Sequence, residues 1–143
     1  DQILYTSTSP ASISQELQTK AIKWSQDIIE SLNYVGVICI EFFVDKYDNL
    51  FVNEIAPRVH NSGHLTIESY NVSQFQSHLR AVCDLNPIGP ELKSKAQMLN
   101  LLGEDIYKYR DQKKIEKNIY FHDYFKKEAK KGRKMGHVTK ILA

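Results

Sequence analysis

The sequence predicts an α+β protein, in which an antiparallel sheet with packed helices is followed by a small β-rich C-terminal domain. Residues 13–32 repeat apolar side chains at helical spacing, whereas residues 35–55 have the β-branched and aromatic composition of a strand hairpin. NPIGP at 86–90 holds two prolines and a glycine, which interrupt helices and strands alike. We therefore expect one domain over residues 1–88 and a second, truncated domain over residues 89–143.

The N-terminal elements follow from local patterns. ILYTST at 3–8 has the composition of a short strand. Ser12, three residues before Gln15, has the form of a capping box, which predicts that a helix begins there. This helix, 13–32, carries apolar residues on one face, at Ile13, Leu17, Ala21, Trp24, Ile28 and Leu32.

The central segment changes to strand periodicity. VGVICIEFFVD at 35–45 and LFVNEI at 50–55 are apolar runs, separated by the turn-like KYDN at 46–49, so they predict an antiparallel hairpin. After Pro57, which cannot donate to a ladder, we expect a loop and then a helix at 73–84. Further strands are expected at 96–102, 117–123 and 136–142.

Composition is that of an ordinary globular protein, with 42% hydrophobic and 25% charged residues among 143. No apolar run approaches the about 20 residues that a membrane-spanning helix requires, and no leader pattern is present. We expect Cys39 and Cys83 to be buried thiols rather than a disulfide, which favours the cytoplasm. Both ends have the character of mid-protein sequence, so we expect part of a longer protein.

Charge is unevenly distributed. Residues 1–100 carry 7 basic and 11 acidic residues, a net charge of −4, whereas residues 101–143 carry 12 basic and 6 acidic residues, a net charge of +6. The basic segment fits a nucleic-acid-binding or anion-binding module, a site for one anionic small molecule, or a solvated surface. Aromatic residues are not regularly interleaved with its lysines, which disfavours a single-stranded nucleic acid as partner.

Two glutamates stand in the expected hairpin, where a carboxylate is costly unless its charge is offset. A four-residue loop at 46–49 pairs Asp45 with Leu50, and therefore Glu41 with Glu54. A two-residue turn shifts the partner by two, which leaves both glutamates on one face. Such a pair is typical of Mg²⁺ binding. It also fits the carboxylates of a glycoside hydrolase, a solvated strand end, or an ion pair with a nearby arginine.

A polar loop follows the second strand directly. Within NEIAPRVHNSGH (53–64), an arginine offers N–H donors to a carboxylate or phosphate. His60 and His64 are four residues apart, a spacing at which two histidines on a helix can bind zinc. Pro57 and Gly63 indicate a loop instead, which disfavours a zinc site. Metal carboxylates followed by anion-binding groups are typical of phosphoryl transfer. The candidate anion- or substrate-binding residues of the loop are Arg58, His60, Asn61 and Ser62.

These residues resemble an enzyme family. YVGVICIEFFV, NEIAPRVHNSGH, SQFQSHLRAVCDL and GRKMGHVT are similar, in this order, to stretches of N5-carboxyaminoimidazole ribonucleotide synthetase, the ATP-grasp enzyme also called the ATPase subunit of phosphoribosylaminoimidazole carboxylase. The resemblance covers essentially the whole chain. It implies the C-terminal half of an ATP-grasp domain joined to most of a small terminal domain.

The resemblance also implies an activity in de novo purine biosynthesis. ATP, bicarbonate and 5-aminoimidazole ribonucleotide would give N5-carboxyaminoimidazole ribonucleotide, ADP and phosphate, with carboxyphosphate as intermediate. It implies ATP and Mg²⁺, as two ions, for cofactors, and a homodimeric parent enzyme in the cytoplasm. Neither nucleic acid nor a membrane is implied as a partner.

Individual residues take roles by the same resemblance. Glu41 and Glu54 match the Mg²⁺-binding glutamates, and Asn53 with Glu54 matches the pair that contacts ATP. Arg58 and His60, which match residues near the transferred carboxylate, are the expected catalytic residues. Arg133 and Lys134 match the basic pair that meets the ribonucleotide. Together with the loop residues, they give the expected substrate-binding set: Arg58, His60, Asn61, Ser62, Arg133 and Lys134.

The chain departs from the family pattern by lacking several of its parts, among them the closing helix after GHVT. The family's N-terminal region, and its lid with a lysine over the phosphates, have no counterpart in the sequence. We therefore expect the 143 residues alone to be inactive. The alternatives are another ATP-grasp carboxylase or ligase, and a non-catalytic basic module that binds anions or nucleic acid.

Overall fold

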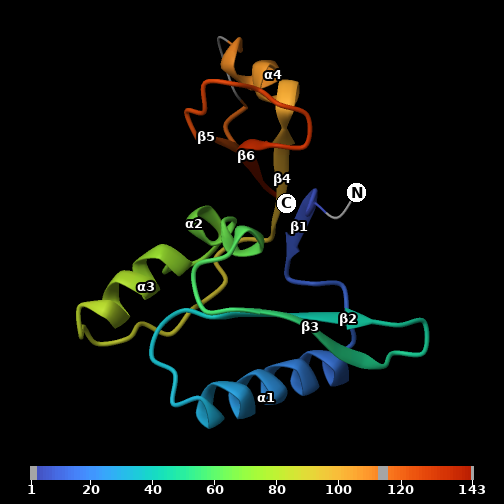
Figure 1. The fold of residues 1–143 in the computed structure, drawn as a ribbon, viewed down its shortest axis with the longest axis vertical. Helices are drawn as coiled ribbons and strands as arrows, with labels where there is room; N and C mark the ends of the chain where they lie inside the picture. Colours follow the sequence, from blue (N-terminus) through green and yellow to red (C-terminus); the bar gives the residue numbers. More distant parts are fainter. Residues whose placement is uncertain (1–2, 113–115, 143) are drawn as a thin grey trace. The chain divides into compact units, whose positions relative to one another are not determined.

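The structure is a computed structural model that describes residues 3–112 and 116–142. Helices and antiparallel strands both contribute, which confirms the α+β class (Figure 1). Within the described residues the strands form a four-stranded sheet and a two-stranded sheet. Among the helices described, none combines the length and the apolarity that a bilayer span requires.

The chain divides into two compact units, each built from separate stretches of sequence. The hairpin unit comprises Ala11–His60 and Gln74–Gly89. The terminal unit comprises the chain up to Pro10, Asn61–Ser73 and the chain from Pro90 onward. The division into domains 1–88 and 89–143 stays a prediction, because these spatial units are discontinuous in sequence.

The hairpin unit is built on one long helix, α1 (Gln15–Ser31), as the apolar spacing predicts. The predicted cap at Ser12 is wrong, because the extended residue before the helix is Ser14, whose Oγ accepts a hydrogen bond from the N–H of Leu17 at 3.2 Å. The helix runs beside the hairpin in Figure 1, and the ring of Trp24 packs on that of Phe42 with centroids 6.3 Å apart.

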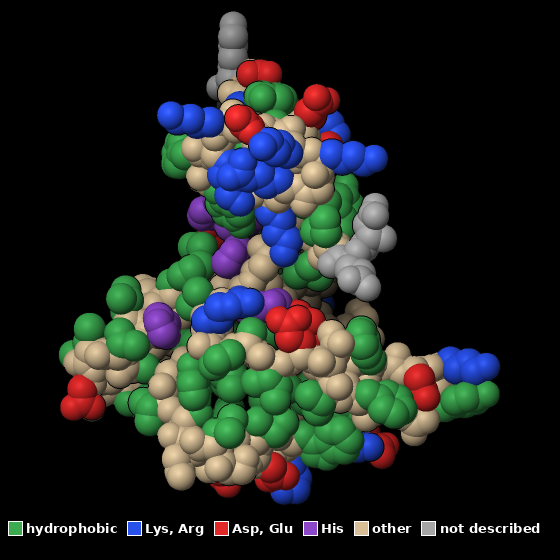
Figure 2. All heavy atoms as spheres, in the orientation of Figure 1, with side chains coloured by type: hydrophobic (Ala, Val, Ile, Leu, Met, Phe, Trp, Pro, Cys, Tyr) green, Lys and Arg blue, Asp and Glu red, His purple; other side chains and the backbone are tan. Residues whose placement is uncertain are grey.

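The hairpin consists of β2 (Cys39–Val44) and β3 (Leu50–Ala56), and α3 (Gln74–Val82) completes the unit. Leu50 and Ala56, at the two ends of β3, are buried, whereas the residues between them are exposed. Hydrophobic side chains accordingly form a broad area on this unit in Figure 2. The hairpin therefore presents its polar residues on a strand pair that is open to solvent.

The terminal unit is a four-stranded antiparallel sheet in the order β1-β4-β6-β5. The strands predicted in this part of the sequence are all observed, β4 at the predicted bounds and the other three with at least one shifted end. Its core contains Leu101, Ile106, Met135 and Val138. The elements of the unit are β1 (Thr6–Ser9), η1 (Asn61–Gly63), α2 (Thr66–Ser69), β4 (Ala96–Leu102), η2 (Gly103–Ile106), α4 (Tyr107–Arg110), β5 (Ile119–Asp123) and β6 (Lys134–Ile141).

An ion pair joins α4 to the end of β5. The Arg110 guanidinium donates to both carboxylate oxygens of Asp123, at 2.6 and 2.7 Å. This fork holds the pKa of the Asp123 carboxyl below its usual range. Basic side chains gather on one face of the terminal unit in Figure 2, which agrees with the positive charge of the C-terminal sequence.

Candidate functional site

The two glutamates of the hairpin lie opposite each other, as predicted. Glu41 on β2 pairs with Glu54 on β3, so both side chains leave the same face of the ribbon. Glu41 is half-buried and Glu54 is exposed. Opposed carboxylates destabilise a strand pair unless a cation lies between them, and their oxygen donors fit a hard divalent ion such as Mg²⁺.

The register near the turn differs from the prediction. Val44, not Asp45, pairs with Leu50, so one more residue than predicted lies in the loop. The register then shifts between Glu41 and Phe42, which leaves Asn53 as an extra residue on β3. The two departures cancel, and the glutamates meet in the predicted way. A β-bulge is a tertiary feature that the strand pattern alone does not reveal.

The bulge has a consequence for Asn53. In a regular strand, Asn53 and Glu54 would point to opposite faces. Here the Asn53 amide donates from Nδ2 to Oε2 of Glu41 at 3.3 Å. Both residues of the predicted ATP-contacting pair, Asn53 and Glu54, therefore lie on the face that Glu41 occupies. The amide also helps to offset the charge of that carboxylate.

His60 returns over the same face after the ladder ends. Its Nε2 lies 3.6 Å from Oε1 of Glu41, and its side chain is 14% exposed. The main chain of His60 is held on both sides by one amide, because its N–H donates to Oε1 of Gln74 and its carbonyl accepts from Nε2 of Gln74, each at 2.8 Å. Gln74 is a candidate positioning residue that the sequence analysis missed.

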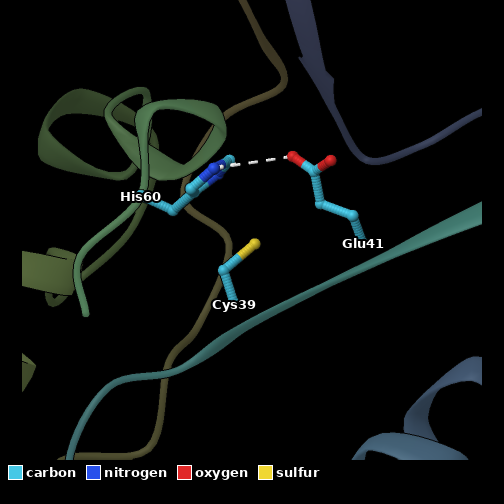
Figure 3. Close-up of side chains that lie close together, drawn as sticks. All are labelled: Cys39, Glu41 and His60. Carbon is cyan, nitrogen blue, oxygen red and sulfur yellow. Dashed lines mark ion pairs between the residues drawn. The ribbon is translucent and has the colours of Figure 1, made fainter. Parts of the chain in front are cut away.

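Cys39 completes this cluster. It stands two residues before Glu41 on β2, and therefore shares its face. One donor atom from each of Cys39, Glu41 and His60 lies within 4.8 Å of the other two. Figure 3 shows the three side chains gathered beside one another. The expectation of a buried thiol is wrong for Cys83, which is exposed, while Cys39 is half-buried.

Arg58 lies between the ladder and His60, and its side chain is exposed. Its guanidinium donates from Nη1 to the carbonyl of Val59 at 3.1 Å, and its N–H donates to the carbonyl of Ala56 at 2.8 Å. These local contacts turn the chain after Pro57, and they leave most of the N–H donors of Arg58 facing solvent.

The remaining predicted residues belong to the terminal unit. Asn61 exchanges two side-chain hydrogen bonds with Asn100, and the carbonyl of Ser62 accepts from Oγ of Ser7 at 2.9 Å. Arg133 is exposed, and Lys134 begins β6 half-buried. The predicted site residues are therefore shared between the two units.

A histidine stack in the terminal unit escaped the sequence analysis. His122 on β5 and His137 on β6 are paired across the strands, with ring centroids 4.4 Å apart and planes 15° apart. The ring of His64 lies 5.1 Å from that of His137, and His122 Nε2 is 2.7 Å from Oε1 of Glu68. The register of β5 and β6 brings His122 to His137, and the chain between η1 and α2 places His64 beside His137.

His137 is the buried member of the stack, 3% exposed. Its Nδ1 lies 2.9 Å from the Tyr124 hydroxyl, while its Nε2 has no hydrogen-bond partner within the described residues. Burial, together with the neighbouring His122 and His64, lowers the pKa of His137 to about 3, whereas burial raises the pKa of Tyr124. His137 is therefore a neutral ring at physiological pH.

The fold and the opposed carboxylates define a class of protein. The profile described as "ATP-grasp domain" matches residues 1–75, just over half of the chain, and the chain belongs to this family. Residues 96–143 match the profile described as "Phosphoribosylaminoimidazole carboxylase C-terminal domain".

Individual relatives show which ATP-grasp enzymes the chain is similar to. The chain is 49% identical over 142 residues to the N5-carboxyaminoimidazole ribonucleotide synthase of Brucella melitensis, covering 99% of this chain and 39% of the relative. The synthase of Bacillus subtilis is 41% identical over 140 residues, covering 97% and 37%. The chain thus spans less than two-fifths of the length of these relatives.

Solved structures agree with these relatives. The synthetase of Staphylococcus aureus complexed with ADP superposes with a TM-score of 0.91 at 40% identity, covering 99% of this chain and 38% of that one. The synthase of Aspergillus clavatus, in complex with ADP and 5-aminoimidazole ribonucleotide, has a TM-score of 0.90 at 35% identity, covering 99% and 40%. The resemblance noted in the sequence is therefore confirmed at the level of fold and relatives.

Proposed function

We propose that this chain is part of an ATP-dependent ligase that carboxylates 5-aminoimidazole ribonucleotide with bicarbonate. The products are N5-carboxyaminoimidazole ribonucleotide, ADP and phosphate, a step of de novo purine biosynthesis. The observation that carries the proposal is the pair Glu41–Glu54 in an ATP-grasp chain, with Asn53 and His60 both beside Glu41. The relatives named N5-carboxyaminoimidazole ribonucleotide synthase support this substrate.

The hairpin supplies the metal and nucleotide site in this proposal. Glu41 and Glu54 hold Mg²⁺, as two ions, and Asn53 with Glu54 contacts ATP. Bound Mg²⁺ neutralises charge on the phosphates during transfer. The amide of Asn53 donates to Oε2 of Glu41, and Nε2 of His60 lies 3.6 Å from Oε1, so both oxygens of this carboxylate are oriented by neighbouring side chains.

The proposed reaction has two bond exchanges. An oxygen of bicarbonate attacks the γ-phosphorus of ATP, the bond to ADP breaks, and carboxyphosphate forms. The amine nitrogen of the ribonucleotide then attacks the carboxyl carbon, or the carbon dioxide released from it. Phosphate leaves and the nitrogen loses a proton. Arg58 offers N–H donors to the carboxyl group, and His60 is held by Gln74 beside the same face.

The terminal unit binds the ribonucleotide in this proposal. Arg133 and Lys134 are cations suited to its phosphate or to its new carboxylate, and Asn61 and Ser62 contribute polar groups. We further propose that the parent enzyme is a homodimer and that it acts in the cytoplasm, where purine synthesis has its substrates.

A chimera tests the proposal. In it, the 143 residues replace the matching segment of the Brucella melitensis synthase, which supplies the rest of the length. With Mg-ATP, bicarbonate and 5-aminoimidazole ribonucleotide, the chimera should release phosphate and form the carboxylated product, while the Glu54→Gln chimera should not. A folded chimera that turns over only with another acceptor would favour a different ATP-grasp ligase. Salt-sensitive RNA or DNA binding without turnover would favour the basic-module alternative.

A further inference from the structure

The face of the hairpin that carries Glu41 has a donor set that Mg²⁺ does not explain. Magnesium takes oxygen ligands, yet the sulfur of half-buried Cys39 and a ring nitrogen of half-buried His60 lie within 4.8 Å of a Glu41 carboxylate oxygen. Thiolate and imidazole are the ligands of zinc and of other soft or borderline transition metals. We propose that Cys39, Glu41 and His60 form a binding site for a Zn²⁺-class ion.

The distances fit this chemistry. In a tetrahedral zinc site the nitrogen and oxygen ligands lie about 3.4 Å apart, and sulfur lies about 3.6 Å from nitrogen. Nε2 of His60 is 3.6 Å from Oε1 of Glu41, and one donor atom from each of the three residues lies within 4.8 Å of the other two. Small side-chain rotations therefore bring all three donors to bonding distance.

The backbone organises the three donors independently of any ion. Cys39 and Glu41 are alternate residues of one strand, so β2 fixes their spacing. His60 is fixed by the double hydrogen bond from its main chain to Gln74. Two ligands on a strand and one on a clamped loop form a site that loses little entropy on binding.

The charge of the site also fits a divalent ion. A thiolate and a carboxylate neutralise two positive charges, and the imidazole binds as a neutral ligand. The side chain of Glu41 is 35% exposed, which leaves room for water at a fourth position, as in zinc sites that bind exchangeable ligands. Because Glu41 is also a proposed Mg²⁺ ligand, an ion held here competes with Mg²⁺ for that carboxylate. Its binding does not depend on the proposed ligase activity.

Cobalt titration of the 143-residue chain, without nucleotide, tests the site. Co²⁺ should bind with the charge-transfer absorption of a thiolate ligand, and Zn²⁺ should displace it, while excess Mg²⁺ should not reproduce it. Cys39→Ser should abolish the band and weaken Zn²⁺ binding by roughly tenfold or more, and His60→Ala should weaken it by roughly tenfold. Cys83→Ser is the matched control, because Cys83 is exposed and lies outside the cluster. A band that survives in Cys39→Ser, or no band in the parent chain, would overturn the proposal.

A second measurement uses only the unaltered chain, in case Cys39→Ser does not fold. Alkylation of each cysteine is followed by mass spectrometry with and without Zn²⁺. Zinc should slow the modification of Cys39 by roughly tenfold or more and leave that of Cys83 unchanged, since a coordinated thiolate is a poor nucleophile. Equal rates for Cys39 in both conditions would contradict the site, and would leave the proposed Mg²⁺ role of Glu41 and Glu54 standing.

Discussion

Asn61 and Asn100 exchange two side-chain hydrogen bonds, of 3.0 and 2.6 Å, between the turn after the hairpin and a buried strand. Asn100 is fully buried, and its Nδ2 also donates to the carbonyl of Leu4 at 2.9 Å. The amide pair therefore anchors η1 to β4. It holds the polar loop that begins at Asn61 against the four-stranded sheet, so Asn61 has a structural role besides its proposed contact with substrate.

We predict that Asn100→Ala lowers the free energy of unfolding by about 1–3 kcal/mol, because it removes a buried amide and leaves the half-buried amide of Asn61 without these two hydrogen bonds. Chemical denaturation measures this value. A double-mutant cycle with Asn61→Ala should give a coupling energy of at least about 0.5 kcal/mol. Asn118→Ala, at an exposed site, is the control and should change stability little. Additive effects of Asn61→Ala and Asn100→Ala would contradict the anchoring role.

We predict that Glu41→Gln and Glu54→Gln each reduce ATP turnover in the chimera by about a hundredfold or more. Each change removes one carboxylate of the proposed Mg²⁺ pair but keeps the shape of the side chain. Circular dichroism should show an unchanged fold. Near-normal ATPase activity in either variant would show that this glutamate is not a metal ligand.

His60→Ala and Arg58→Ala should impair carboxylation in the chimera more than they impair nucleotide binding. Both residues follow the Asn53–Glu54 pair, on a stretch released from the ladder by Pro57. Calorimetry should give an ATP affinity within about threefold of the parent, while product formation falls by about tenfold or more. An equal loss of ATP affinity and of carboxylation would show that Arg58 and His60 act in nucleotide binding.

The double variant Arg133→Ala/Lys134→Ala should raise the KM for 5-aminoimidazole ribonucleotide by about tenfold, with the KM for ATP changed little. The physical reason is the loss of two cations expected to meet the ribonucleotide's phosphate or carboxylate. Lys127→Ala, at an exposed lysine of the same unit, is the matched control. A similar rise with Lys127→Ala would indicate a general effect of positive charge.

Stability should depend on pH through His137. Its pKa is lowered to about 3 in the folded state by burial and by His122 and His64, against an ordinary value of 6.5. Below pH 6.5, His137 therefore binds a proton in the unfolded chain but stays neutral in the folded chain. The stability linked to neutral His137 is therefore fully present above pH 6.5. As pH drops from 6.5 toward 3, the free energy of unfolding falls by about 1.4 kcal/mol per pH unit.

A non-titrating variant isolates this effect. His137→Gln keeps a hydrogen-bonding side chain near Tyr124, and should flatten the dependence of unfolding free energy on pH between 6.5 and 4. Glu68, His64 and His122 face the same stack and are unchanged in the variant, so the difference in slope between variant and parent reports on His137. The same slope in His137→Gln as in the parent would show that His137 is not the responsible group.

Periodicity and composition determined most of the elements by themselves. The α1 helix, the hairpin and the strands of the terminal sheet were predicted because each follows from side chains that are near neighbours in sequence. The opposition of Glu41 and Glu54 was also predicted, since strand geometry fixes which side chains share a face. Motif strings such as NEIAPRVHNSGH carried the family resemblance in the same way.

The tertiary structure alone decided which distant residues meet. The bulge at Asn53, the clamp of Gln74 on His60 and the meeting of Cys39 with His60 depend on how a loop returns over a strand. The stack of His122 on His137 depends on the register between two strands separated by a long connection. Local sequence patterns record the conformation of neighbouring residues. Contacts between distant residues are fixed by packing and hydrogen bonding summed over the whole chain, and no local pattern contains that sum.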